Sequence, residues 1–204
     1  SRSESAQRLT AAGVDVFVGQ AAFTGADSLS VKGAILHFAK AVIATGARPA
    51  TPSIPGLAEA GFLTNENAFE LSEAPRRLLV IGGGPLGCEM AQAFCRFGVR
   101  TVIVQKRPLF LPREERDAAQ VLSDAFARDG IEVRLNTRVV NVRAEGTRKV
   151  VDLVSDDYES TVTVDAILAG TGRVPSVHGL ALEAAGIDYD RRHGIHVDDF
   201  LRTS

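Results

Sequence analysis

The pattern of apolar and polar residues divides the chain into two differently organised parts. Residues 14–46 contain short apolar runs, among them VDVFVGQAAF, LSVKG, AILHF and AVIATG, with the turn-like TGADS between the first two. This alternation predicts antiparallel strands that lead into one buried strand at the end of the segment. Residues 48–75 are rich in proline, which disfavours helix at each preceding residue, so we interpret them as a segment that crosses between two bodies.

From Arg77 onward the order strand, glycine turn, helix, strand, helix, strand predicts a right-handed parallel βαβαβ unit. The expected strands are LLVIG, TVIV and IEVRL, and the expected helices cover 86–97 and about 114–128, each closed by a glycine. Residues 138–169 return to alternation and predict a β-meander that leads into AILAG. The predicted fold class is therefore α/β, with a Rossmann-like parallel sheet and a meander.

Composition narrows the class of function. The chain has 204 residues, of which 45% are hydrophobic and 24% charged, as in ordinary globular proteins. Its 23 lysines and arginines against 25 acidic residues give a net charge of −2, without the basic stripe that nucleic acid binding needs. No apolar run approaches the ~20 residues of a membrane span, and the start has no hydrophobic signal core. We therefore expect a cytoplasmic protein with neither nucleic acid nor membrane as a partner.

Cysteine and histidine positions predict neither a redox pair nor a metal site. On one helix Cys88 and Cys95 would lie two turns or ~10 Å apart, too far for a disulfide, so both are expected to be reduced. The two histidines of HGIH, 193–196, would point to opposite faces of a strand and are interpreted as surface residues. Asp156 and Asp157 are interpreted as turn residues.

A GxGxxG sequence stands between the first strand of the predicted βαβαβ unit and the helix that follows it. Gly82 is expected to make the tight turn, Gly84 to let a pyrophosphate approach the backbone, and Gly87 to let helix and strand pack closely. Free N–H groups and the positive end of the helix dipole would then face the phosphates. The alternative is a glycine-rich turn, in an α/β domain without nucleotide function. The predicted dinucleotide site consists of Gly82, Gly83, Gly84, Pro85, Leu86 and Gly87.

The end of the second strand of this unit distinguishes the two nicotinamide cofactors. An NAD site has Asp or Glu there to accept a hydrogen bond from the ribose 2′-hydroxyl, whereas this chain has Gln105 followed by Lys106 and Arg107. A neutral amide beside two cations suits a 2′-phosphate, so the hypothesis is a preference for NADPH. In the alternative, the two cations are solvated surface charges, Gln105 still bonds the ribose hydroxyls, and NADH remains usable.

Four motifs, in this order, resemble the pyridine nucleotide-disulfide oxidoreductases, in particular the branch similar to mercuric reductase and dihydrolipoamide dehydrogenase. They are VIATGARP at 42–49, LVIGGGPLGCEMAQAFCRFG at 79–98, LPREERDAA at 111–119 and TGRVP at 171–175. In that family an NAD(P)H-binding domain interrupts an FAD-binding domain, and a dimerisation domain follows. The resemblance covers nearly the whole chain and implies a flavoprotein oxidoreductase that is a homodimer at full length.

The resemblance also implies a division of the chain and a set of cofactor contacts. Residues 1–47 would be part of the FAD domain, 48–75 a crossing linker, 76–171 the NAD(P)H-binding domain, and 172–204 the return toward the FAD domain. Glu89 matches a glutamate that supports the flavin side through a lysine outside this chain, and would otherwise be a charge in the first helical turn. The implied contacts are Ala44, Thr45, Gly46 and Arg173 with the flavin nucleotide, Gly172 with nicotinamide, and Val139 with adenine.

Several features of that family have no counterpart in this sequence: the N-terminal GxGxxG for FAD, the redox-active cysteine pair, the Gly-Asp flavin motif and the C-terminal His-Glu pair. We therefore expect a fragment that does not hold FAD tightly by itself, with the rest of its FAD domain as partner. In the whole protein, hydride would pass from NAD(P)H to FAD and on to a disulfide, metal ion, quinone or similar acceptor. The alternative is a stand-alone dinucleotide-binding module without catalysis, which would have a finished core instead of exposed apolar surface on 14–46.

Overall fold

The computed structural model describes residues 2–156 and 158–204, so Asp157, interpreted above as a turn residue, lies outside the described part. The chain forms two compact units. One comprises the residues up to Arg48 together with Val174–Ser204, and the other comprises Pro49–Arg173. We call them the first and the second unit. The strands in which the chain passes from one unit to the other, β4 (Ala47–Pro49) and β12 (Arg173–Pro175), form a two-stranded sheet.

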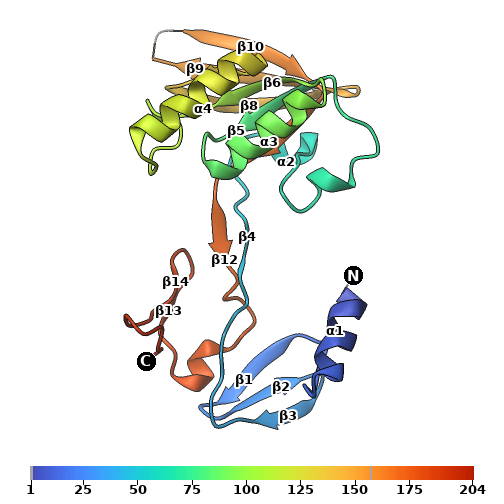
Figure 1. Ribbon diagram of the computed structural model, residues 1–204, viewed down its shortest axis with the longest axis vertical. Helices are drawn as coiled ribbons and strands as arrows, with labels where there is room; N and C mark the ends of the chain where they lie inside the picture. The colour runs from blue at the N-terminus through green and yellow to red at the C-terminus, as the bar shows by residue number, and fades with distance from the viewer. Residues whose placement is uncertain (1, 157) are drawn as a thin grey trace. The chain divides into compact units, whose positions relative to one another are not determined.

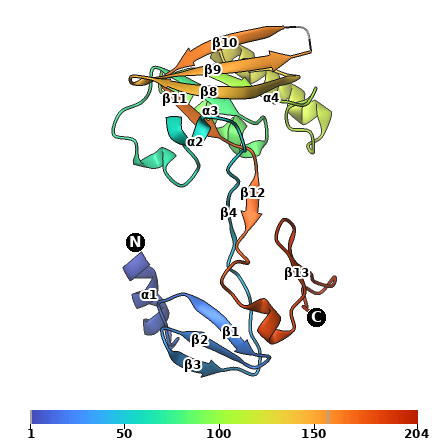
Figure 2. The same cartoon turned by 180° about the vertical axis from the view of Figure 1, so that it is seen from behind.

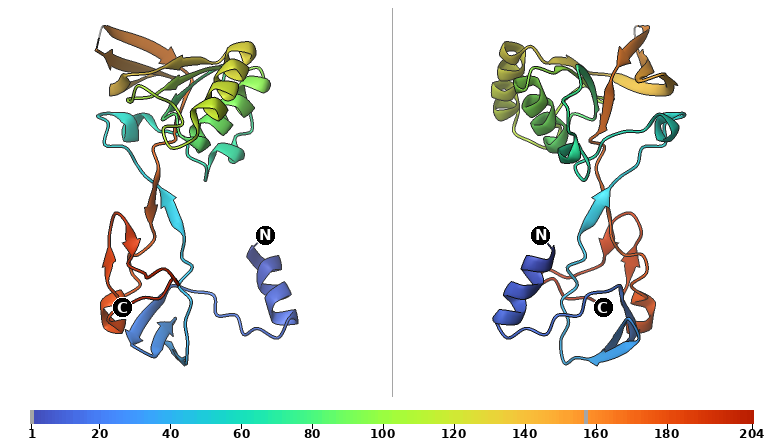
Figure 3. Two further views of the ribbon diagram at one scale, coloured as in Figure 1. Left: turned by 60° about the vertical axis from the view of Figure 1, so that its left-hand side comes forward. Right: turned by 90° about the vertical axis from the view of Figure 1, so that its right-hand side faces the viewer.

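A four-stranded parallel sheet lies at the centre of the second unit, with two helices side by side on one of its faces (Figures 1 and 3). The helices make the two crossover connections from β5 to β6 and from β6 to β7, which confirms the predicted parallel βαβαβ arrangement. In sheet order, the strands are β11 (Ala166–Ala169), β5 (Arg77–Ile81), β6 (Arg100–Val104) and β7 (Glu132–Arg134), and the helices are α3 (Pro85–Arg96) and α4 (Arg116–Asp129).

An antiparallel meander covers the other face of the parallel sheet, as Figure 2 shows from behind. This confirms the prediction for 138–169, including the lead into β11. Its long strands pair along nearly their whole length, with one register shift between Val139 and Asn141. The meander strands are β8 (Thr137–Glu145), β9 (Arg148–Ser155) and β10 (Glu159–Val164), in the order β10-β9-β8.

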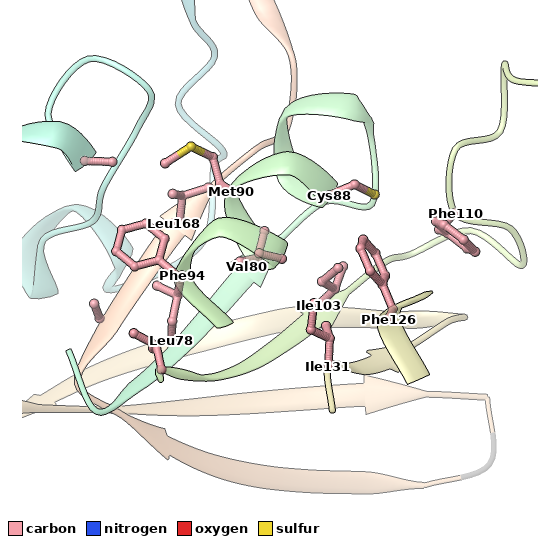
Figure 4. Packing of buried hydrophobic residues seen from close by; sticks show 14 of the residues in the cluster. Leu78, Val80, Cys88, Met90, Phe94, Ile103, Phe110, Phe126, Ile131 and Leu168 are labelled. Carbon is pink, nitrogen blue, oxygen red and sulfur yellow. The ribbon is translucent and has the colours of Figure 1, made fainter. Parts of the chain in front are cut away.

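The apolar core of the second unit follows from the alternation of side chains along β5. Leu78 and Val80 belong to the cluster between the sheet and the two helices, where Phe94 and Phe126 also lie (Figure 4). Leu79 and Ile81 point to the opposite face, into a cluster shared with the meander. A parallel strand covered on both faces has to be apolar at every position, which is why LLVI is an unbroken apolar run.

The segment expected to be a crossing linker, 48–75, is instead largely part of the second unit. It contains the short helices α2 (Leu57–Ala60) and η1 (Ala68–Glu70). Leu57 is fully buried in the cluster beneath the meander. The backbone of Leu63 also extends the parallel sheet, since its N–H donates to Ile167 O at 2.7 Å and its oxygen accepts from Ala169 N at 2.8 Å. The prolines exclude a long helix here, but they do not prevent extended backbone from packing.

The first unit has a small core of its own. Phe23, Val177, Leu182 and Ile187 form its buried cluster, which joins residues from both ends of the chain. The antiparallel strands expected within 14–46 are present between Ala21 and His37. The elements of this unit are α1 (Arg2–Ala11), β1 (Ala21–Gly25), β2 (Ser28–Val31), β3 (Ala34–His37), η2 (Leu182–Ala185), β13 (Tyr189–Asp190) and β14 (Gly194–Ile195).

Two predictions for the first unit were wrong. The run AVIATG at 41–46, expected to be a buried strand, forms no strand, and Val42 is 92% exposed. The run at 14–18 also forms no strand. An apolar strand is buried where neighbouring strands and layers cover it, and no described strand pairs with 41–46. The polar helix α1 was not expected from the apolar pattern, because its sequence contains few apolar residues.

Candidate functional site

The glycine loop between β5 and α3 is compact because backbone approaches backbone on two sides. Gly82 has φ +108°, a value that side-chain-bearing residues rarely adopt, and its N–H donates to Val104 O at 2.9 Å. A β-carbon on Gly82 would lie 2.6 Å from the oxygen of Gly170, and one on Gly87 would overlap the oxygen of Gly82. The expected roles of Gly82 in the turn and of Gly87 in close packing are therefore confirmed.

Gly84 differs from these two glycines because the space around it is open. No heavy atom beyond its chain neighbours lies within 4 Å of the position that its β-carbon would occupy. Gly84 is the N-cap of the twelve-residue helix α3, with Pro85 at the first helical position, as its fixed φ favours. Within the described residues, the N–H groups of Gly83, Gly84 and Leu86 have no hydrogen-bond acceptor. Unbonded N–H groups at a helix N-terminus, beside open space, fit a phosphate group.

The loop from 105 to 115 folds back over the glycine loop. Leu111 N–H donates to Gly83 O at 2.7 Å, and the β-carbon of Phe110 would lie 3.0 Å from one on Gly83. Arg116, the first residue of α4, holds this loop from the other side by donating to the carbonyl oxygens of Phe110, Leu111 and Glu114. Sequence analysis did not identify Arg116, because nothing in LPREERDAA indicates that its guanidinium turns back to carbonyl groups that precede it.

Gln105 lies at the end of β6, where the ribose of a dinucleotide is expected. It is only 8% exposed, and its side-chain Nε2 donates to Leu109 O at 3.2 Å. Its backbone joins the neighbouring elements, with N–H donating to Arg134 O at 2.9 Å and O accepting from Thr137 N at 3.0 Å. No described residue donates a hydrogen bond to the side-chain Oε1, so this oxygen can accept one from a ligand. The amide nitrogen, by contrast, is already used within the protein.

Lys106 and Arg107 are both exposed. The oxygen of Arg107 accepts from Asn136 N at 3.2 Å, which joins the end of β6 to the start of β8. Lys106 borders a hollow of about 320 Å³ at this junction. The hollow is lined by Lys106, Asn136, Arg138, Val154, Ser155 and Asp156. Sequence analysis missed it because its residues come from three strand ends that only the fold brings together.

Other residues that the resemblance assigns to cofactor contacts lie in varied surroundings. Val139, expected against adenine, is 9% exposed and belongs to the cluster beneath the meander. Glu89 is exposed. The sequence placed it in the first turn of the helix, but as the fifth residue of α3 it lies just beyond that turn. Gly172 has φ +113°, and its oxygen accepts from Ala50 N at 2.9 Å; the neighbouring Arg173 is exposed.

Residues 44–46, expected near the flavin, are exposed in the first unit. Thr45 Oγ1 donates to Ser176 O at 2.9 Å, and Ser176 N donates to Gly46 O at 3.0 Å. These two bonds fix the segment to the strand end after β12. The hydroxyl donor of Thr45 and the backbone oxygen of Gly46 are therefore both engaged within the unit.

The cysteines are unpaired, and the described residues form no group of metal ligands. Both cysteines are free, and burial, with the nearby charge of Glu89, raises the pKa of the Cys88 thiol to about 12. His193 and His196 are exposed. Over residues 2–156 and 158–204, no group of three or more His, Cys, Asp or Glu side chains could hold a metal ion. The helices in these ranges also lack the length and apolar character that a bilayer crossing requires.

Comparison with known proteins gives consistent matches over the chain. The family model described as pyridine nucleotide-disulphide oxidoreductase matches residues 1–204. A glutathione reductase of Burkholderia cepacia is 34% identical over 193 residues, which are 95% of this chain and 42% of that protein. A mercuric reductase of Staphylococcus aureus is 29% identical over 94% of this chain and 35% of its own length.

A solved structure resembles the whole chain. The Cu(II) complex of the HOCl-induced flavoprotein disulfide reductase RclA from Escherichia coli superposes with a TM-score of 0.87 at 32% identity, covering 100% of this chain and 46% of that one. This chain thus spans less than half the length of each of these three proteins. The likeness includes the parallel sheet and the mixed α/β architecture described above.

Proposed function

Because the chain belongs to the pyridine nucleotide-disulphide oxidoreductase family, we propose that it is the NAD(P)H-binding portion of an FAD-dependent oxidoreductase. The proposed enzyme takes hydride from NAD(P)H and passes it through FAD to a disulfide, metal ion, quinone or similar acceptor. One observation carries the proposal: Gly84 leaves open space beside three unbonded N–H groups at the N-terminus of α3. In a Rossmann-like domain this place accepts the pyrophosphate of a dinucleotide.

The chemistry of the two cofactors limits what this chain contributes. The nicotinamide supplies the hydride and the flavin accepts it, so the protein's part is to bind and orient them. The N–H groups of Gly83, Gly84 and Leu86 would bind the pyrophosphate, and Oε1 of Gln105 would accept from a ribose hydroxyl. Gly172 would approach the nicotinamide closely, because glycine has no side chain in the way.

The residues after β6 support a preference for NADPH over NADH. A carboxylate there would repel a 2′-phosphate, whereas this chain has the neutral Gln105 and the exposed cations Lys106 and Arg107. Since Nε2 of Gln105 is engaged with Leu109 O, the phosphate charge has to be met by the cations. NADH binding through Oε1 of Gln105 remains compatible with this arrangement.

Exposed apolar side chains in the first unit favour the oxidoreductase over a stand-alone binding module. Val14, Phe17, Val18 and Val42 are between 46% and 92% exposed. We propose that the remainder of an FAD-binding domain covers these residues in the whole protein, together with the cofactor contacts at 44–46 and Arg173, and that the whole protein is a homodimer. A folded sample of this chain should then bind a dye specific for exposed apolar surface.

Titration calorimetry with NADPH and NADH tests the proposal, using the wild-type chain and Gly84→Val. Position 84 has φ −85° and ψ 177°, which any residue adopts, and its β-carbon meets nothing within the protein. Valine should therefore leave the fold intact while filling the space that the pyrophosphate needs. We expect Gly84→Val to abolish binding of both nucleotides. Ala93→Val, at an exposed position of the same helix, should leave binding unchanged.

Two results would contradict the proposal. If a folded wild-type chain, checked by circular dichroism, binds neither nucleotide, then the glycine loop is only a turn. If Gly84→Val binds both nucleotides as tightly as the wild-type chain, then the nucleotide lies elsewhere. A preference for NADPH that weakens as salt is added supports recognition of the 2′-phosphate by exposed cations.

A further inference from the structure

We propose that Arg138, a residue of β8, acts with Lys106 to determine specificity for a 2′-phosphorylated nucleotide by binding the phosphate in the hollow between them. The inference rests on the proposed function, since it concerns the adenosine end of the same dinucleotide. Strand β8 lies outside both the GxGxxG loop and the residues that follow β6. Arg138 and Lys106 both line this hollow of about 320 Å³.

The position of the hollow follows from the backbone hydrogen bonds around the end of β6. Thr137 N donates to Gln105 O at 3.0 Å, and Asn136 N donates to Arg107 O at 3.2 Å. The start of β8 is thus bonded directly to the residues expected at the ribose. Lys106 follows Gln105 in the chain, so the hollow that it lines begins next to the ribose position.

The side chains around the hollow suit a phosphate monoester. Lys106 and Arg138 are both exposed, and neither has an ion-pair partner among residues 2–156 and 158–204. The amide of Asn136 adds a neutral donor to the lining. Arg presents a fork of N–H donors that matches phosphate geometry, and Lys adds a compact charge. Two cations from different segments of the chain can contact one phosphate from two sides.

The strand register explains why Arg138 faces the hollow. In β8 the next residue, Val139, belongs to the apolar cluster beneath the meander, so Arg138 points to the opposite face. Its register partner in β9 is Val154, and both residues line the hollow. The side chain of Arg138 is exposed at the start of β8, so the packing of the meander does not require it.

Asp156 is the one acidic residue in the lining of the hollow. With Lys106 and Arg138 it leaves a net formal charge of +1 on the lining side chains. A carboxylate repels a phosphate, so its removal should act in the direction opposite to removal of Arg138. A hollow that does not receive the phosphate would show neither effect.

The experiment measures the affinity of the whole chain for adenosine 2′,5′-bisphosphate and for 5′-AMP, which differ only by the 2′-phosphate. Arg138→Ala should weaken bisphosphate binding about tenfold and leave 5′-AMP binding unchanged, since one charge-assisted contact is lost. Asp156→Asn should strengthen bisphosphate binding alone. Arg100→Ala removes the same charge from an exposed arginine at the amino end of β6, the opposite end of that strand from Lys106, and should change neither.

Failures of the inference and of the proposed function are distinguishable. Suppose that the wild-type chain binds NADPH and NADH. If Arg138→Ala then weakens binding of the bisphosphate and of 5′-AMP equally, or changes neither affinity, Arg138 does not recognise the 2′-phosphate, and the proposed function stands. The same holds if the wild-type chain does not distinguish the two probes. If the folded wild-type chain binds no nucleotide at all, the proposed function fails and the inference fails with it.

Discussion

The α-carbon of Gly87 faces the carbonyl oxygen of Gly82 so closely that a β-carbon at position 87 would overlap this oxygen. Because the atom that it meets is backbone, no side chain can rotate away to relieve the overlap. We expect Gly87→Ala to lower the free energy of unfolding by about 1–3 kcal/mol, the range typical of overpacking. Urea denaturation followed by circular dichroism measures it. Gly84→Ala, at a position with open space, is the control, and equal losses in both variants would contradict this account.

Arg116 should determine how rigidly the loop before α4 covers the glycine loop. Its guanidinium donates to Phe110 O at 3.3 Å and Glu114 O at 2.8 Å, and also to Leu111 O. In Arg116→Ala these contacts are lost, so the amide of Leu111, bonded to Gly83 O, should exchange its hydrogen faster. Hydrogen exchange measured by NMR tests this. Arg113→Ala, a neighbouring exposed arginine, should leave that amide unchanged.

A weaker nucleotide affinity is a second consequence of Arg116→Ala, if the loop orders Gln105 and Lys106. The loss should affect NADH and NADPH similarly, because Arg116 contacts carbonyl groups of the loop and not the cations. Calorimetric titration of both cofactors measures it. A change confined to NADPH would mean that Arg116 acts on the 2′-phosphate itself.

The outer face of the meander should make stability depend on acid pH. Hydrogen bonds from Arg143, Asn141 and Thr161 lower the pKa of Asp152 from 3.8 to about 2. A lowered carboxyl pKa stabilises the folded state above the unfolded value, and this contribution is lost as pH falls through the folded value. The melting temperature of the wild-type chain should therefore exceed that of Asp152→Asn above pH 4, and the difference should narrow between pH 4 and pH 2. A difference that stays constant over this window would contradict the assignment.

The two cysteines should differ in reactivity. Burial raises the pKa of Cys88 to about 12, so this thiol is neither ionised nor accessible at mildly alkaline pH. Cys95 is partly buried, and its Sγ donates to Asp129 O at 3.1 Å. We expect Cys95→Ser, which retains only Cys88, to react with a thiol reagent at the rate of global unfolding, and Cys88→Ser to react faster. Equal rates for the two variants would show that Cys88 is accessible in the folded protein.

Patterns that depend on neighbours in the chain were predictable. The apolar run LLVI, the helix that follows and the return to alternation after 138 predicted β5, α3 and the meander, because each element's own residues carry the apolar pattern that its buried faces require. The roles of Gly82 and Gly87 were predictable for the same reason, since a strand that turns directly into a helix leaves no room for a β-carbon at those positions.

Features that depend on distant residues were decided only by the tertiary structure. AVIATG is apolar enough for a buried strand, yet no described strand pairs with it, and Val42 is exposed. Residues 48–75 contain several prolines, yet Leu57 is buried because the meander covers it. The apolar pattern states what a segment is able to bury, but burial occurs only where another segment supplies the covering surface.

The candidate site divides in the same way. From the sequence alone came the glycine loop, Gln105 and the two cations after it, because a dinucleotide site is encoded by a strand, a turn and a helix that are contiguous. The hollow at Arg138 arises only when the end of β6, the start of β8 and the end of β9 are brought together. Hydrogen bonds between segments about thirty residues apart bring these side chains together. The local pattern of apolar and polar residues contains no sign of such contacts.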